Sequence, residues 1–136
     1  MASTFVHTCV RVRDPEASLR FYEKLGFERR GRLNFDTAYN LYLGLPGGGD
    51  VLELTVNDGR TEPYDLGDGY NHLAITVDDL DGLLAALAED GIEPAKPPYH
   101  PGGREDLPRI CFVADPDGYR IELIEGRFDT PQDPDR

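Results

Sequence analysis

His-Thr-Cys-Val-Arg-Val-Arg-Asp at residues 7–14 recurs in altered form as His-Leu-Ala-Ile-Thr-Val-Asp-Asp at residues 72–79. A helix-like segment follows each copy and ends in a glycine, Gly26 in the first case and Gly91 in the second. A second match, Val-Leu-Glu-Leu at residues 51–54 and Arg-Ile-Glu-Leu at residues 120–123, closes each half. The chain therefore contains two structural repeats, and each repeat contributes one histidine and one glutamate.

The hydrophobic periodicity predicts the elements of each repeat. In the first, Asp14 is the expected N-cap of a helix with Pro15 at its first position, and Gly26 ends that helix. In the second, either Asp78 or Asp79 is the expected cap. Strands are expected at residues 5–12, 27–33, 38–45, 51–56, 72–77, 92–95, 110–114 and 119–124, and the second helix at residues 80–90.

These elements predict an α+β fold, with two tandem βαβββ modules that form a curved mixed sheet around a metal-binding cavity. Module 1 covers about residues 4–57 and module 2 about residues 69–126, within a single domain at residues 1–126. Residues 127–136 are expected to be a flexible tail. The proline-rich loop at residues 96–108 is long, which is typical of a functional lid or of disorder.

Composition and net charge restrict the kinds of molecule that this chain can bind. The net charge of -12 disfavours nucleic acid and anionic membranes, and no apolar run is long enough to cross a bilayer. We expect a cytoplasmic protein, because no secretion signal opens the chain and two cysteines are too few for a disulfide framework. Cys9 is interpreted as small buried filler, and His100 in the proline-rich loop as a solvated side chain.

Four polar side chains are expected on the strand face turned away from the helices: His7, Glu53, His72 and Glu122. Burying two carboxylates together is costly unless a cation neutralises them. Two imidazoles and two carboxylates leave two positions of an octahedron open, which suits Ni, Co, Mn or a six-coordinate Zn. The sequence therefore predicts a site for one divalent metal ion.

Several motifs resemble glyoxalase I, the lactoylglutathione lyase family of the vicinal oxygen chelate superfamily, over roughly residues 5–125. They are His7-Thr8-x-x-Arg11-Val12, Phe21-Tyr22-x-x-x-Leu25-Gly26-Phe27, Glu53-Leu54-Thr55-x-Asn57, Tyr64-Asp65-Leu66-Gly67, His72-x-Ala74 and Asp115-Pro116-Asp117-Gly118-Tyr119-x-Ile121-Glu122-Leu123-Ile124.

The resemblance implies roles for these residues. His7, Glu53, His72 and Glu122 are the implied metal ligands, with Ni or Co favoured and Zn or Mn as alternatives. Glu122 is the implied general base, and Glu53 is the implied alternative base for the opposite face of the substrate. The resemblance also assigns Arg11 and Asn57, beside His72, to substrate binding. It implies a homodimer whose shared active sites each combine one half of each chain.

The implied reaction converts the hemithioacetal of methylglyoxal and a small thiol into a lactoyl thioester. One departure concerns the thiol: Pro101 stands where the family has a basic residue before Gly-Gly, with Arg104 and Arg109 nearby. Two alternatives stay open. One is another metalloenzyme of the superfamily, such as an epimerase, and the other is a metal-free protein that sequesters an antibiotic. The intact His and Glu set disfavours the latter.

Overall fold

The computed structural model describes residues 1–136 and divides into two units. The first unit comprises Met1–Tyr70 and Asp115–Tyr119, and the second comprises Asn71–Ala114 and Arg120–Arg136. The elements, in chain order, are β1 (Thr8–Val12), α1 (Pro15–Lys24), β2 (Glu28–Asn34), β3 (Ala38–Gly44), β4 (Leu52–Asn57), β5 (Leu73–Val77), α2 (Leu80–Glu89), the 3-10 turn η1 (Pro101–Gly103), β6 (Ile110–Ala114) and β7 (Arg120–Glu125). None of the helices has the length and apolar composition needed to cross a bilayer.

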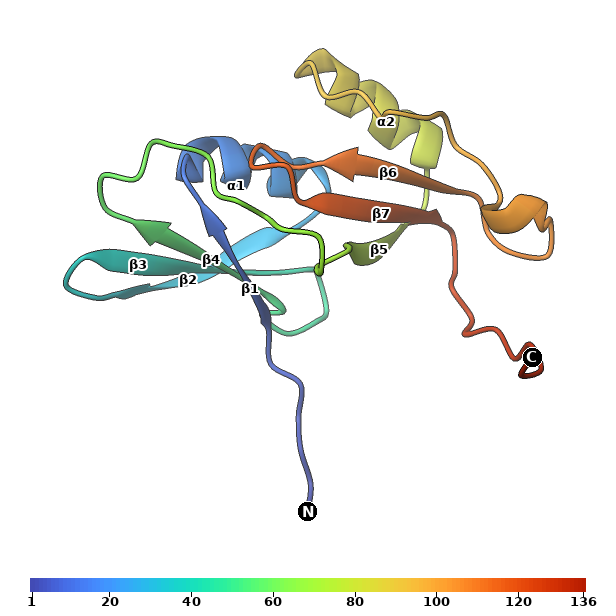
Figure 1. Cartoon of the computed structure of the whole chain (residues 1–136), viewed down its shortest axis with the longest axis horizontal. Helices are drawn as coiled ribbons and strands as arrows, with labels where there is room; N and C mark the ends of the chain where they lie inside the picture. Colours follow the sequence, from blue (N-terminus) through green and yellow to red (C-terminus); the bar gives the residue numbers. More distant parts are fainter. The chain divides into compact units, whose positions relative to one another are not determined.

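The first unit is a four-stranded mixed sheet in the order β1-β4-β3-β2, with α1 against one face (Figure 1). β1 and β4 run parallel, and the remaining neighbours run antiparallel. Burial alternates along β4, where Leu52, Leu54 and Val56 are buried and the residues between them are half-buried. The face opposite α1 therefore carries the polar side chains of β4.

Helix α1 begins and ends as its sequence predicts. The Asp14 carboxylate accepts a hydrogen bond from the Ala17 N–H at 3.2 Å, and Pro15 occupies the first turn. At the other end Gly26 has φ +104°, a left-handed conformation that glycine adopts without the clash of a Cβ atom.

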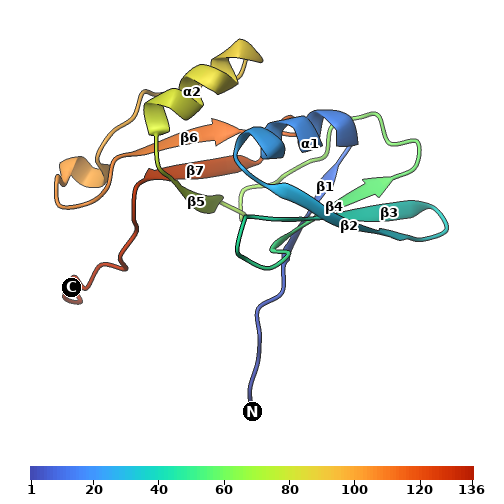
Figure 2. The ribbon, with the colours of Figure 1, turned by 180° about the vertical axis from the view of Figure 1, so that it is seen from behind.

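The second unit repeats this plan with one strand fewer. Its sheet has the order β5-β7-β6, with β5 and β7 parallel, and α2 lies over one face (Figure 2). Of the two expected caps, Asp79 is the one used, because its carboxylate accepts from the Gly82 N–H at 2.9 Å. The α+β class is confirmed.

The strand expected at residues 92–95 is wrong. The segment after α2 has no regular structure, and only Tyr99 forms an isolated bridge, to Ile110 on the edge of β6. Pro94, Pro97 and Pro98 cannot donate to a strand ladder, which explains why pairing is confined to one position. The second module is therefore βαββ rather than βαβββ.

A buried carboxylate anchors the turn at residues 115–119 in the first unit. Tyr22 donates from its hydroxyl to Asp115 Oδ2 at 2.5 Å, and Asp115 Oδ1 accepts from the backbone N–H groups of Asp117 and Tyr119 at 2.9 Å each. Burial raises the pKa of Asp115, and these hydrogen bonds lower it. The effect of burial is the larger, so the pKa is about 6. The turn thus fixes Tyr22 at the centre of the core.

Candidate active site

The first half of the site is a histidine and glutamate pair. Glu53 lies between buried Leu52 and Leu54 on β4, so its side chain points to the face opposite α1. His7 comes immediately before β1, and its Nε2 lies 3.3 Å from Glu53 Oε1. The edge of the imidazole packs against the Tyr42 ring, with centroids 5.7 Å apart.

A hydrogen-bond network holds the Glu53 carboxylate. Asn40 donates from Nδ2 to Glu53 Oε2 at 3.2 Å and accepts from the Thr55 hydroxyl at 2.7 Å. Burial alone would raise the pKa of Glu53, but hydrogen bonds from Tyr42, Cys9 and Asn40, together with the charge of His7, lower it below its ordinary value. Glu53 is therefore held in its ionised form.

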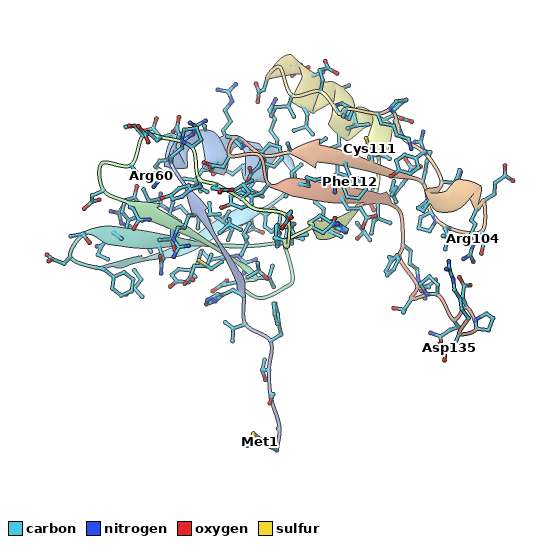
Figure 3. All side chains as sticks on the ribbon, in the orientation of Figure 1. Met1, Arg60, Arg104, Cys111, Phe112 and Asp135 are labelled. Carbon is cyan, nitrogen blue, oxygen red and sulfur yellow. The ribbon has the colours of Figure 1, made fainter.

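The second half contains an equivalent pair. His72, one residue before β5, places Nε2 at 3.3 Å from Glu122 Oε1 on β7. The His72 ring packs edge-on against Phe112 of β6, with centroids 5.1 Å apart (Figure 3). On its other side the imidazole Nδ1 donates to Asn71 Oδ1, which also accepts from Arg120. Nδ1 is occupied by this hydrogen bond, so Nε2, on the side of the ring that faces Glu122, is the nitrogen that remains for a metal ion.

Both pairs fit a divalent metal ion. Two ligand atoms bound at about 2.1 Å lie about 3 Å apart when they occupy adjacent octahedral positions. The 3.3 Å separation of nitrogen and oxygen in each pair is close to that value. The structure brings His7 to Glu53 and His72 to Glu122, but no group of three or more His, Cys, Asp or Glu side chains is placed to hold an ion. Each unit thus supplies two of the four expected ligands.

The expected substrate-binding residues occupy the same face of the first unit. Arg11 is exposed on β1 beside Thr55 of β4, and Asn57 is half-buried at the end of β4. Asn57 donates to the Tyr64 hydroxyl at 3.0 Å, and the Tyr64 ring lies under the guanidinium of Arg60 (Figure 3). The connector after β4 therefore orients the Asn57 side chain.

Two single-residue expectations are wrong. Cys9 is exposed rather than buried filler, because it lies on the polar face of β1, where its Sγ is 3.2 Å from the Thr55 hydroxyl. His100 is half-buried rather than solvated, and it donates from Nδ1 to the Leu107 carbonyl oxygen at 2.9 Å. His100 therefore closes the proline-rich loop on itself.

The arginines near Pro101 are already paired with carboxylates. Arg104 bonds to Asp106 and Asp133, and Arg109 bonds to Asp81 and Glu125. The second unit instead offers a cavity of about 310 Å³ whose lining includes Lys96, Tyr99, Phe112 and Arg120. Lys96 Nζ lies 3.6 Å from the centre of the Tyr99 ring. The guanidinium carbon of Arg120 lies 4.2 Å from the centre of the Phe112 ring.

Motifs and spacing alone do not identify the residues around the two pairs, chiefly Asn40, Tyr42 and Phe112. Alternation along residues 38–44 would place Asn40 and Tyr42 on one face, opposite Leu41 and Leu43. Their position beside Glu53 depends on the register of β3 against β4, in which Tyr42 faces Glu53 and Asn40 faces Thr55. That register depends on the conformation of the turn at residues 45–51, which the residue types there do not specify.

Comparison with known proteins identifies the family of this chain. The family model described as Glyoxalase/Bleomycin resistance protein/Dioxygenase superfamily matches residues 4–123. The chain belongs to this superfamily. It is 38% identical over 129 residues to a probable lactoylglutathione lyase of Vibrio parahaemolyticus, with 90% of each chain covered. It is 34% identical over 127 residues to the lactoylglutathione lyase of Salmonella typhimurium, with 90% of this chain and 92% of the relative covered.

Solved structures of the superfamily share the fold. The trypanothione-dependent glyoxalase I of Leishmania major is 32% identical, with a TM-score of 0.77 over 91% of this chain and 87% of that one. Glyoxalase I of Zea mays is also 32% identical, with a TM-score of 0.79 over 93% of this chain and 46% of the plant protein. The expected family is therefore confirmed.

Proposed function

We propose that this chain is a lyase of the lactoylglutathione lyase type, which isomerises the hemithioacetal of methylglyoxal and a small thiol to a lactoyl thioester. The observation that carries the proposal is the pair of matched contacts, His7 to Glu53 and His72 to Glu122, each at 3.3 Å. Relatives named lactoylglutathione lyase at 34% and 38% identity support it.

The four residues of the two pairs are the proposed ligands of one divalent metal ion, with Ni or Co favoured and Zn or Mn as alternatives. Such an ion, when bound, supplies Lewis acid chemistry to the two neighbouring substrate oxygens. We propose that each site combines a pair from one copy of the chain with a pair from a second copy, as a homodimer, and each unit supplies the two ligands it holds. Both cysteines are free, in keeping with a proposed cytoplasmic location.

Proton transfer is assigned to the carboxylates. Glu122 removes the proton from the carbon that bears sulfur and returns it to the adjacent carbon, while the hydroxyl proton of the first carbon passes to the oxygen of the second. The former carbonyl thus becomes the alcohol, and the carbon bonded to sulfur becomes the thioester carbonyl. Glu53 takes this role for a substrate presented from the opposite face. No oxidant or second substrate is consumed, because the product is an isomer of the hemithioacetal.

Recognition of the thiol is assigned to both units. Arg11 and Asn57 lie on the Glu53 face of the first unit. In the second, Lys96 and Arg120 line the cavity beside Phe112, and neither is paired with a carboxylate. In a chain with net charge -12 these cations favour a thiol that carries a carboxylate, such as glutathione.

The test is turnover by metal-stripped protein reconstituted with Ni or Co. We expect methylglyoxal plus glutathione to yield a thioester absorbance only after metal is restored. Glu122→Gln should abolish turnover, whereas Glu28→Gln, a matched change on an exposed strand residue, should not. Full turnover by Glu122→Gln would contradict the assigned base. A protein that binds metal but is inert with every thiol would favour an epimerase, and one that binds no metal would favour the sequestering alternative.

A further inference from the structure

One edge of β1 has no neighbouring strand in its sheet. The first sheet has the order β1-β4-β3-β2, so β1 lies at its end. The Thr8 N–H donates to the Val51 carbonyl oxygen at 3.0 Å, which turns the backbone polar groups of Thr8, and of every second residue after it, towards β4. The backbone polar groups of Arg11, and of Arg13 directly after the strand, therefore face the open edge and need other partners.

The turn at residues 115–119 supplies those partners. The Tyr119 hydroxyl donates to the Arg11 carbonyl oxygen at 3.0 Å, and the Arg13 N–H donates to Asp117 Oδ1 at 3.2 Å. The peptide groups before and after Val12 are therefore both anchored. Two side chains of one turn take the place that a neighbouring strand would occupy.

Tyr119 is itself held from the core. Its N–H donates to Asp115 Oδ1 at 2.9 Å, and its carbonyl oxygen accepts from the Asp115 N–H at 2.8 Å. Asp115 is 5% exposed, and its Oδ2 accepts from the Tyr22 hydroxyl. The Tyr119 ring packs edge-on against Tyr70, with centroids 6.2 Å apart. A series of hydrogen bonds thus runs from the core through Tyr119 to the backbone of Arg11.

The two arginines at this edge differ in their charge partners. Arg13 Nε lies 3.9 Å from Asp117 Oδ1, and the other oxygen of that carboxylate accepts from the Ser18 hydroxyl at 3.4 Å. Arg11, in contrast, is exposed on the Glu53 face of the sheet and forms no ion pair with a carboxylate of the chain. Its guanidinium is therefore available to a carboxylate of the substrate.

We propose that Tyr119 is a positioning residue, whose hydroxyl fixes the end of β1 so that Arg11 presents its guanidinium to a carboxylate of the thiol. The inference rests on the proposed function and deepens it, because it adds to thiol recognition a residue that acts only through Arg11. A side chain on an unanchored strand edge would have to be ordered when the thiol binds, and that ordering weakens affinity.

The test measures the Kd for S-methylglutathione by calorimetry, alongside kcat and KM of the Ni²⁺-loaded protein. This probe carries the carboxylates of glutathione and no reacting group. Tyr119→Phe should raise Kd and KM by about fivefold at unchanged kcat, the effect of one lost hydrogen bond. The control is Tyr39→Phe, which removes the hydroxyl of a β3 tyrosine whose ring lies against Arg32 and should change none of the three.

A double-mutant cycle separates positioning from support of the fold. Because Tyr119 acts through Arg11, Tyr119→Phe should raise Kd by about fivefold in wild-type protein and not at all in Arg11→Ala. Far-ultraviolet circular dichroism verifies that each variant is folded. If wild-type protein binds the probe and turns over, but Tyr119→Phe binds it as tightly or weakens binding equally in both backgrounds, this inference alone fails. Wild-type protein that neither binds the probe nor turns over overturns the proposed function and this inference together.

Discussion

Replacing Asp115 with asparagine should change how the stability of the protein depends on pH. The Asp115 carboxyl is 5% exposed, and burial raises its pKa from 3.8 to about 6. A rise of that size corresponds to about 3 kcal/mol of free energy of unfolding. Because the folded pKa is above the unfolded one, the folded state binds the proton more tightly. This group therefore destabilises the fold above pH 6, and the loss is recovered as pH falls towards 3.8.

Asp115→Asn retains an oxygen for the two backbone N–H groups that Oδ1 accepts from, and it carries no charge. The free energy of unfolding of the variant, relative to wild type, should therefore be higher at about pH 7 than at about pH 4, by about 2.4 kcal/mol, because part of the effect is already present at pH 4. Urea denaturation of the apo protein at both pH values measures it. Asp36→Asn, an exposed change between β2 and β3, is the control for losing one carboxylate. A difference between Asp115→Asn and wild type that is the same at both pH values would refute the reasoning.

Two further predictions concern the helix end and the thiol. Gly26→Ala should lower the free energy of unfolding by about 1 kcal/mol, because φ +104° is strained for alanine. The control is Gly31→Ala, where an added Cβ meets nothing within 4 Å and no such loss is expected. Equal losses for the two variants in urea denaturation would disprove the strain. Arg120→Ala should raise KM for the glutathione hemithioacetal by about tenfold and leave the KM for a thiol without carboxylates unchanged, as expected for one lost charged contact. If Arg104→Ala, which removes an arginine already paired with Asp106 and Asp133, raises KM equally, the assignment to Arg120 is wrong.

Most of the fold could be predicted from the sequence because local signals agree with the packing. Asp14 with Pro15 marks the start of α1, and the alternation along residues 52–57 places Glu53 opposite the buried face. The segment after α2 misled the prediction, because apolar Ile92 and Ala95 resemble a short strand while the neighbouring prolines prevent the pairing that a strand needs.

The pairs of the candidate site could be predicted from the repeat, but their surroundings could not. That His7 meets Glu53 follows from the parallel pairing of β1 with β4, in which Cys9 faces Glu53. The surroundings of the two glutamates depend on which residues lie across from them, and the register of a hairpin follows from the conformation of its turn, which the residue types there do not specify. Tyr42 in one half and Phe112 in the other could not be matched before that register was known.

The turn that buries Asp115 makes the first unit depend on distant sequence, because its core takes the acceptor for the Tyr22 hydroxyl from a residue 93 positions further along the chain. A fragment ending at Tyr70 would leave this phenol, with no exposed surface, lacking a partner, and Arg13 lacking Asp117. The core of the first unit is therefore complete only when the turn at residues 115–119, late in the chain, is in place.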